Sequence, residues 1–327
     1  MRQVDLGIFA HDEAAGIAAM VVASLAQARA CAAAGIDLRI LVLANGCGDD
    51  TGARAAAAGA EVTDLAEGGK SRTWNRFVHD LSRPGAEALV FADADIEWTE
   101  PDMLARLISG LLARPGLWVL NSRPVKDLAL HGAKGLVPRL ALKAAGGLDD
   151  WKSAICGQLY AMPAARARIF HLPVGLPVED GFLRAMVLTD GLTSPVDLSR
   201  IDGAEGVFHV YGSETTLRGL IRHQERIVIG SAINLCLFDH LRSLPPEARA
   251  PALRLAAADE AWLRGILRAC LPRLPYGYVP VHFLVKRLTR PGALRRAGVT
   301  ALGFGFDLIV YLGAQIRMAR GAGAGFW

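Results

Sequence analysis

Two aspartates separated by a single residue are candidates for metal chemistry. Asp93 and Asp95 directly follow the apolar run 88–92 (ALVFA), which has the composition of a buried β-strand. Carboxylates at positions i and i+2, where a buried strand ends, can converge on one divalent cation such as Mn²⁺ or Mg²⁺. That cation would bridge and neutralise the diphosphate of a nucleotide. A solvated turn is the alternative, and the position after a strand favours the metal.

A second acidic pair lies later in the chain, where Glu179 and Asp180 open a predicted helix over 179–188. Acidic residues at a helix N-terminus ordinarily stabilise the helix dipole, so this pair alone does not establish catalysis. His209 follows in the strand-like run 207–211 and is either a further metal ligand or a structural histidine. The chemistry of these residues therefore depends on the elements that position them.

The first 120 residues alternate between predicted strands and predicted helices. The strands are 4–10, 38–44, 60–65 and 88–92, and the helices are 14–34, 50–58, 71–81 and 100–113, the last with Thr99 as its N-cap. This order predicts a doubly wound α/β sheet whose ligand lies at the carboxyl ends of the strands. Residues 122–177 are less regular, as an acceptor-binding region would be, and long helices follow from residue 213.

The chain resembles glycosyltransferase family 2, the inverting nucleotide-sugar enzymes of the GT-A fold. Five segments carry the resemblance in matching order across residues 4–212: FAHDEA (9–14), LVLANGCGDDT (41–51), GKSRTWN (69–75), DAD (93–95) and VED (178–180). It implies a Rossmann-like, mixed and mainly parallel sheet flanked by helices in a catalytic domain 1–212. It also implies a divalent metal cofactor, Mn²⁺ or Mg²⁺, held by Asp93, Asp95 and His209.

The same resemblance assigns roles to individual residues. Asp180 matches the general base that accepts the proton of the acceptor hydroxyl, and Glu179 orients the loop or contacts the acceptor. Donor binding is assigned to residues near the strand ends: Ala10, His11, Glu13, Asn45, Asp49, Lys70, Asn75, Asp93 and Gly157. Four of these also have plain structural interpretations, as a helix cap (Glu13), a turn former (Asn45), a surface lysine (Lys70) and a loop support (Asn75).

Departures from the family pattern narrow the expected activity. Ala44 stands where an aspartate is common, and Phe9 replaces a proline. The Q-x-x-R-W motif of processive synthases is reduced to HQERI (223–227), which indicates transfer of one sugar rather than polymerisation. A nucleotidyltransferase on a similar fold and a catalytically degenerate scaffold protein remain as alternatives.

The part of the chain from Arg218 onward differs in charge from the rest. It holds 16 basic and 6 acidic residues, a net charge of +10, against 20 basic and 26 acidic residues before it, a net charge of −6. The apolar stretch 299–316 is nearly long enough to span a bilayer, but it contains Asp307 and has arginines on both sides. We therefore expect region 213–327 to be a helical, membrane-associating extension that lies in the cytoplasmic leaflet. A buried core helix is the alternative.

Composition limits the partners and the compartment. The five cysteines are odd in number and form no C-x-x-C pair, which argues against a disulfide framework and against a zinc site and fits a reducing compartment. The first residues show no signal-peptide pattern, so we expect the cytoplasmic face of a membrane. The arginines of the basic region alternate with aliphatic residues, which argues against nucleic acid. The expected partners are a nucleotide-sugar donor, a lipid or glycan acceptor and an anionic membrane surface.

Overall fold

The chain divides into two compact units. The computed structural model describes residues 1–131, 150–214, 216–270, 278–286, 288 and 297–321. Unit 1 contains Met1–Leu172 and Asp180–Ser213, and unit 2 contains Pro173–Glu179 and Glu214–Trp327. The sequence places the domain boundary between residues 212 and 213, and it gives no sign that the short segment 173–179 groups with the helical part.

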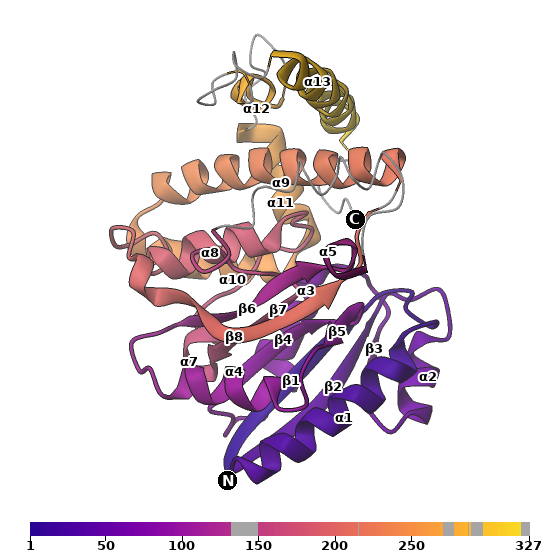
Figure 1. Ribbon diagram of the computed structural model, residues 1–327. Helices are drawn as coiled ribbons and strands as arrows, with labels where there is room; N and C mark the ends of the chain where they lie inside the picture. The colour runs from indigo at the N-terminus through magenta and orange to yellow at the C-terminus, as the bar shows by residue number, and fades with distance from the viewer. Residues whose placement is uncertain (132–149, 215, 271–277, 287, 289–296, 322–327) are drawn as a thin grey trace. The chain divides into compact units, whose positions relative to one another are not determined.

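Unit 1 is built on one mixed sheet of eight strands in the order β3-β2-β1-β4-β7-β6-β8-β5 (Figure 1). Its parallel half contains β1 (Arg2–Ala10), β2 (Ile36–Asn45), β3 (Glu61–Leu65) and β4 (Ala88–Asp93). The other half contains β7 (Leu159–Pro163), β6 (Val119–Lys126), β8 (Ile201–Tyr211) and β5 (Ile96–Trp98). β7 runs antiparallel to both β4 and β6, whereas β6 and β8 run parallel.

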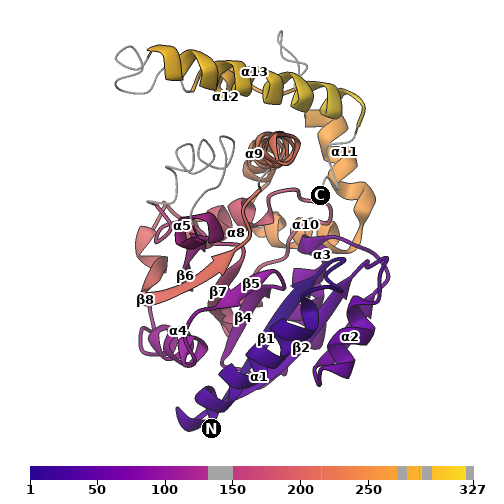
Figure 2. The same ribbon diagram turned by 45° about the vertical axis from the view of Figure 1, so that its right-hand side comes forward.

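Three helices cover one face of this sheet: α1 (Ile17–Ala33), α2 (Thr51–Ala57) and α4 (Met103–Leu112). Alternate side chains of β1, Val4, Leu6 and Ile8, share one buried core with these helices. Figures 1 and 2 show α1 and α4 on the same side of the strands. Burial of this face follows the period-2 alternation of side chains along a strand.

The opposite face is packed with aromatic rings. Phe77 lies against Gly7 of β1, where a Cβ atom would come within 2.9 Å of the ring. Phe91 of β4 stacks between Trp74 and Tyr160, with ring centroids 5.6 Å and 4.6 Å away. The Trp74 indole N–H also donates to the Tyr160 hydroxyl at 2.9 Å. These contacts fix the segment that leads from β3 back to β4.

The sequence-based assignment of elements needs three corrections. Thr99 is not a helix cap, because α4 begins at Met103 and the Thr99 hydroxyl donates instead to the Phe208 carbonyl at 2.5 Å. The helix expected over 71–81 is α3 (Lys70–Asn75) followed by a π-helical segment, Arg76–Leu81. The region 122–177 supplies most of β6 and all of β7, although its residues 132–149 lie outside those described. Short helices complete the unit: α5 (Asp127–His131), α7 (Ala164–Ala167), α8 (Glu179–Leu188) and the 3₁₀ turn Leu198–Arg200.

Unit 2 is helical, as expected for the region after residue 213. Its helices are α9 (Leu217–Ser243), α10 (Pro246–Ala258), α11 (Glu260–Cys270), α12 (His282–Val285) and α13 (Ala297–Ala319). Buried Glu225 of α9 accepts from Arg317 of α13 at 2.8 Å, and its carboxylate lies so close to Gly313 that a Cβ atom there would overlap it. Tyr311 donates to the Val279 carbonyl at 2.9 Å. α13 is therefore held along one side by polar contacts.

Candidate functional site

One edge of the sheet collects most of the predicted site residues. The carboxyl ends of β1, β2, β4 and β8 meet there, and β7, which runs the opposite way, begins there. Asp93 pairs in register with Phe9, so the aspartate pair lies beside the loop that follows β1. The strand directions thus bring residues distant in sequence to a common edge, as the α/β pattern predicts.

Lys70 connects two of these loops. Its ammonium lies 2.6 and 2.8 Å from the two carboxylate oxygens of Asp93 and donates to the Gly157 carbonyl at 3.1 Å. The Lys70 and Asp93 side chains are only 16% and 22% exposed. The backbone N–H of Asp93 donates to the Gln158 carbonyl at 2.9 Å. Lys70 therefore lies among the predicted site residues and is not an exposed surface lysine.

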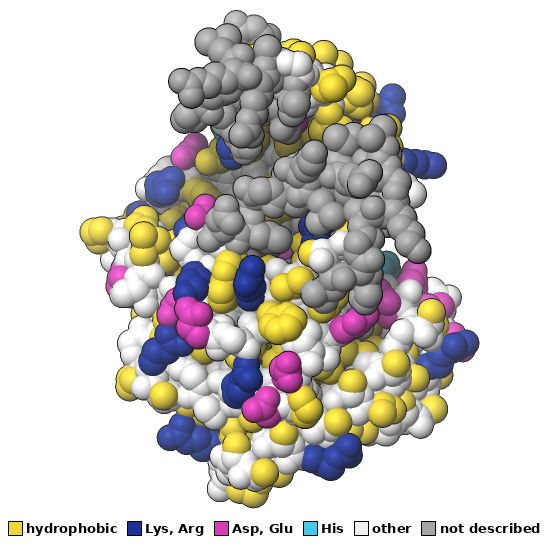
Figure 3. Space-filling view, in the orientation of Figure 1, with side chains coloured by type: hydrophobic (Ala, Val, Ile, Leu, Met, Phe, Trp, Pro, Cys, Tyr) yellow, Lys and Arg dark blue, Asp and Glu magenta, His cyan; other side chains and the backbone are white. Residues whose placement is uncertain are grey.

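Four carboxylates lie close enough at this edge to interact electrostatically, those of Glu13, Asp49, Asp93 and Asp95. Burial and then the Asp93 charge raise the pKa of Asp95, and the Lys70 charge partly opposes this shift. Burial also raises the pKa of Glu13, with further contributions from Asp95, Asp49 and Asp93. Figure 3 shows acidic side chains gathered on this side of unit 1. Carboxylates that repel one another in a partly buried place are stabilised by a cation, so these residues fit a divalent metal ion.

Asp180 lies next to this group. Its Oδ2 atom is 3.2 Å from the position that a Cβ atom on Gly157 would take, so the carboxylate rests against the glycine whose carbonyl binds Lys70. Burial, with a smaller effect of Asp180, raises the pKa of the Cys156 thiol to about 12, which argues against Cys156 as a nucleophile. The edge thus combines a carboxylate suited to proton transfer with an acidic cation site.

The segment that precedes Asp180 is fixed within unit 2. Asn234 of α9 donates to the Val178 carbonyl at 3.0 Å, and Val178 leaves no room for a side chain at Gly230. Glu179 is buried at 8% exposure, which is consistent with an orienting rather than a chemical role.

The loops after β1 and β2 hold each other in place. His11 Nδ1 donates to the Asn45 carbonyl at 2.7 Å, and the Asn45 side chain accepts from the Gly69 N–H at 2.9 Å. A hydrogen bond from the Thr51 hydroxyl, and smaller contributions from the backbone N–H groups of Ala14 and Thr51, lower the pKa of Asp49. These contacts fix the conformation of the two loops at this edge of the sheet.

Other predicted residues have structural contacts. Both polar atoms of the Asn75 amide bond the backbone of Leu172, at 2.7 and 2.9 Å, which matches the loop-support interpretation. Ala10 is buried, and its carbonyl accepts from the Cys47 thiol at 3.5 Å. Ala10 therefore offers only backbone atoms to a ligand.

His209 is fully buried in β8, where it pairs with Trp98 of β5. Its Nδ1 lies 3.0 Å from the Ser122 hydroxyl, whereas Nε2 has no hydrogen-bond partner in the described part of the chain. Burial lowers its pKa to about 4, so the imidazole is neutral at pH 7 and retains a lone pair. His209 thus has the protonation state of a metal ligand, although its ring does not form a compact ligand group with Asp93 and Asp95.

The described residues contain one group of three metal-ligating side chains with all ligand atoms within 4.8 Å, and it consists of His11, Asp12 and Cys47. The sequence interpretation includes His11 but misses Asp12 and Cys47. Asp12 has a left-handed backbone (φ 55°), and its carboxylate accepts from the Gly48 N–H at 2.7 Å. The available sequence signal was the pair of short loops that carry these residue types directly after two adjacent strands.

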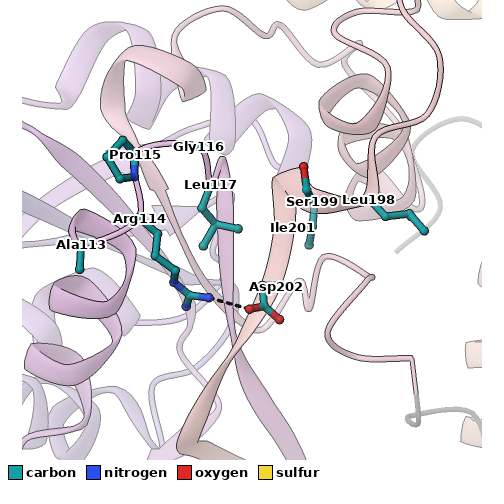
Figure 4. A pocket seen from close by; sticks show the side chains of 9 residues that line it. All are labelled: Ala113, Arg114, Pro115, Gly116, Leu117, Leu198, Ser199, Ile201 and Asp202. Atoms are coloured by element: carbon teal, nitrogen blue, oxygen red, sulfur yellow. Dashed lines mark hydrogen bonds and ion pairs between the residues drawn. The ribbon is translucent and has the colours of Figure 1, made fainter.

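A separate pocket of about 660 Å³ lies at the opposite edge of the sheet, where β6 and β8 begin (Figure 4). Arg114 and Asp202 form an ion pair at 2.6 Å on its wall. The two charges of this pair neutralise each other. The predicted catalytic, donor-binding and metal-binding residues do not line this pocket. The pocket therefore does not change the assignment of the site.

Two solved structures are similar to this chain. Mannosyl-3-phosphoglycerate synthase from Rubrobacter xylanophilus matches with a TM-score of 0.51 and 18% identity, over 75% of this chain and 77% of that chain. Glucosyl-3-phosphoglycerate synthase from Mycobacterium tuberculosis, solved with Mn²⁺, uridine diphosphate and phosphoglyceric acid, matches with a TM-score of 0.49 and 22% identity, over 72% and 77%. No protein-family model matches the chain, and no curated protein matches it. The first similarity confirms a GT-A-like fold and, at this identity, nothing finer.

Proposed function

We propose that the chain is a glycosyltransferase that moves one sugar from a nucleotide-sugar to an acceptor hydroxyl, with inversion at the anomeric carbon. The observation that carries the proposal is the continuous contact from Asp93 through Lys70 to Gly157 and from Gly157 to Asp180. These contacts place Asp93 and Lys70, which suit a departing diphosphate, close to the Asp180 carboxylate, which suits an attacking hydroxyl. Membership of family 2 is part of the proposal and rests on the five sequence segments.

The residues divide the reaction between them. Asp180 accepts the proton of the acceptor hydroxyl as its oxygen attacks the anomeric carbon. The bond between that carbon and the diphosphate oxygen breaks, and the nucleoside diphosphate leaves with the electron pair. Lys70 supplies positive charge to the leaving group. A divalent cation held by Asp93 and Asp95, when bound, neutralises the rest of the diphosphate charge.

His209 is proposed as a further ligand for this cation. Its neutral imidazole and its unpartnered Nε2 atom within the described residues support the role. Glu13, whose pKa is raised by the same carboxylates, is proposed to contact the donor.

The decisive test combines product analysis with one matched pair of variants. The full-length chain is incubated with Mn²⁺, a panel of nucleotide-sugars and candidate acceptors, and the anomeric configuration of the product is read by NMR. Asp95→Ala should abolish transfer, whereas Asp102→Ala, which removes an exposed carboxylate at α4, should not. Full activity of Asp95→Ala in EDTA would refute the cation site, and a retained configuration would remove Asp180 from its role. Pyrophosphate release with formation of a nucleotide-sugar would support a nucleotidyltransferase, and no turnover with any donor would support a degenerate scaffold.

We further propose that unit 2 attaches the enzyme to the cytoplasmic leaflet and that the acceptor is a lipid or a lipid-linked glycan. One side of α13 is buried, with Val310, Tyr311, Ala314 and Met318, and its other side exposes a row of large apolar residues: Leu302, Leu308, Ile309, Leu312 and Ile316. Figure 3 shows hydrophobic side chains gathered over this helix. Thr300–Ala319 is also long and apolar enough to cross a bilayer by composition. The net charge of +10 from Arg218 onward complements anionic lipid.

The polar contacts of α13 favour a helix that lies in the interface over one that spans. Arg317, Tyr311 and Gln315 bond other parts of unit 2 on the buried side. A helix with one apolar side exposed and one side bound to protein suits the boundary between headgroups and acyl chains. Because a similar solved structure is a mannosyl-3-phosphoglycerate synthase, small phosphorylated acids belong in the acceptor panel beside lipids. Transfer to the small acid alone would contradict the lipid acceptor.

A further inference from the structure

We propose that His11, Asp12 and Cys47 form a zinc site, separate from the cation site at Asp93 and Asp95. The three side chains come from the loops after β1 and β2, which are parallel neighbours with Ala10 opposite Ala44. Their ligand atoms all lie within 4.8 Å of one another. Imidazole nitrogen, thiolate sulfur and carboxylate oxygen are the ligand types that Zn²⁺ uses in proteins. This site does not depend on the proposed sugar transfer.

The backbone around the three residues orients each of them. His11 Nδ1 lies 2.7 Å from the Asn45 carbonyl, which can only accept, so Nδ1 carries the hydrogen and Nε2 carries the lone pair of the neutral ring. A hydrogen bond from one ring nitrogen to a backbone carbonyl is the usual outer contact of a metal-binding histidine. Nε2 in turn lies 3.8 Å from Asp12 Oδ2. Two electron-pair donors thus face each other at a separation suited to a shared metal ion.

Asp12 and Cys47 are oriented in a comparable way. The Gly48 N–H donates to Asp12 Oδ1 at 2.7 Å, which leaves Oδ2 as the oxygen that faces His11. The Cys47 thiol lies 3.5 Å from the Ala10 carbonyl and is partly accessible to solvent, unlike buried Cys31, Cys156 and Cys236. Binding requires the thiol to lose its proton, so zinc uptake releases a proton. A thiolate, a carboxylate and a neutral imidazole then balance the charge of Zn²⁺.

The geometry requires only a small adjustment. Ligand atoms around a tetrahedral Zn²⁺ with bonds of about 2.0–2.3 Å are about 3.3–3.8 Å apart. Atoms within 4.8 Å therefore approach by about 1 Å, which side-chain rotation supplies because the His11 and Asp12 side chains are 49% and 52% exposed. Three protein ligands leave the fourth position to water or to a ligand. The site is therefore open and exchangeable.

The test uses the reduced, metal-free full-length chain and Co²⁺ as a spectroscopic substitute for Zn²⁺. One equivalent of Co²⁺ should produce a thiolate-to-cobalt charge-transfer band, and Zn²⁺ should displace it. Cys47→Ser should remove the band and weaken Zn²⁺ binding at least tenfold. Cys236→Ser, the matched control at a buried cysteine of α9, should change neither. Asp95→Asn should also leave Zn²⁺ binding unchanged, which separates this site from the cation site of the proposed transferase.

A second measurement covers the case in which Cys47→Ser does not fold. In the wild-type chain, Zn²⁺ should protect Cys47 from alkylation, as mass spectrometry of the labelled peptides would reveal. Unchanged Zn²⁺ affinity in Cys47→Ser would overturn the proposal. Loss of binding in Asp95→Asn alone, or alkylation of Cys47 at the same rate with and without Zn²⁺, would overturn it as well.

Discussion

Replacing Lys70 by Met removes an ammonium that contacts Asp93, and it should change two binding equilibria in opposite directions. Without a donor, Mn²⁺ should bind Lys70→Met more tightly than the wild type, because the ion no longer competes with the lysine for the carboxylate. The nucleotide-sugar should bind more weakly, because its diphosphate loses a positive partner. A purely structural lysine would not produce opposite signs.

The magnitude follows from the geometry of the pair. The ammonium lies 2.6 and 2.8 Å from the two Asp93 oxygens, and both side chains are largely shielded from solvent. A hydrogen bond to a charged group contributes about 1.5–3 kcal/mol, whereas an exposed ion pair contributes less than about 1 kcal/mol. A partly exposed pair with this geometry lies between these ranges, at about 1.5–2 kcal/mol. That energy corresponds to a roughly 10- to 30-fold change in the dissociation constant of Mn²⁺.

Isothermal titration calorimetry of Mn²⁺, with and without nucleoside diphosphate, measures both effects. Arg76→Met is a suitable control because it removes a cation from an exposed pair with Asp80 on the π-helical segment. This control should bind Mn²⁺ and donor as the wild type does. Equal or weaker Mn²⁺ binding by Lys70→Met in the absence of donor would refute the competition between lysine and metal.

Three further predictions concern catalysis, pH and attachment. Asp180→Asn should lower the transfer rate by about 10²- to 10⁴-fold while nucleotide binding persists. Gly157→Ala should also slow transfer, because its new methyl group displaces the Asp180 carboxylate. Steady-state rates measure the loss of transfer, and binding titrations show whether the nucleotide still binds. Asp95→Asn should raise the melting temperature more at pH 7 than at pH 4. Burial raises the pKa of Asp95 in the folded protein, so the stability that this carboxyl contributes is present at low pH and is lost as the pH rises through that pKa. Leu312→Ser with Ile316→Ser should reduce co-sedimentation with anionic vesicles at unchanged melting temperature, since both residues are about half exposed, and unaltered sedimentation would contradict attachment through α13.

The parallel half of the sheet could be predicted from sequence because its strands are continuous apolar runs separated by helices. β1 to β4 lie where the apolar runs indicate, within two residues at either end. β6 escaped detection because it carries buried polar residues. Asn121 is fully buried, and its amide bonds the backbone of Trp151, Ala154, Cys156 and Asp202. A polar residue satisfied by distant backbone cannot be distinguished from a loop residue by local pattern.

The position of Asp93 could be predicted because it follows a parallel strand, and ligands bind at the carboxyl edge of such a sheet. Lys70 and Gly157 were assigned only by the family resemblance, because β7, which brings Gly157 to Lys70, lies in a region expected to be irregular. The group of His11, Asp12 and Cys47 could not be predicted, because it depends on a left-handed residue at Asp12 and on hydrogen bonds between two loops. The misassigned cap at Thr99 has a similar origin, since its hydroxyl bonds β8 rather than the helix that follows.

The reversed strand β7 has a consequence for the order in which the chain folds. Lys70 is anchored to the Gly157 carbonyl, 87 residues further along the chain, and the Asp93 backbone is anchored to Gln158. Contacts between distant parts of a chain form late, because the loop between them must close first. During synthesis, β1 to β4 therefore emerge and pair well before the loop that precedes β7 can complete the edge. Donor binding should then appear only after β7 has entered the sheet, so a nascent chain that ends before Gly157 remains without affinity for the nucleotide even when its first four strands have formed.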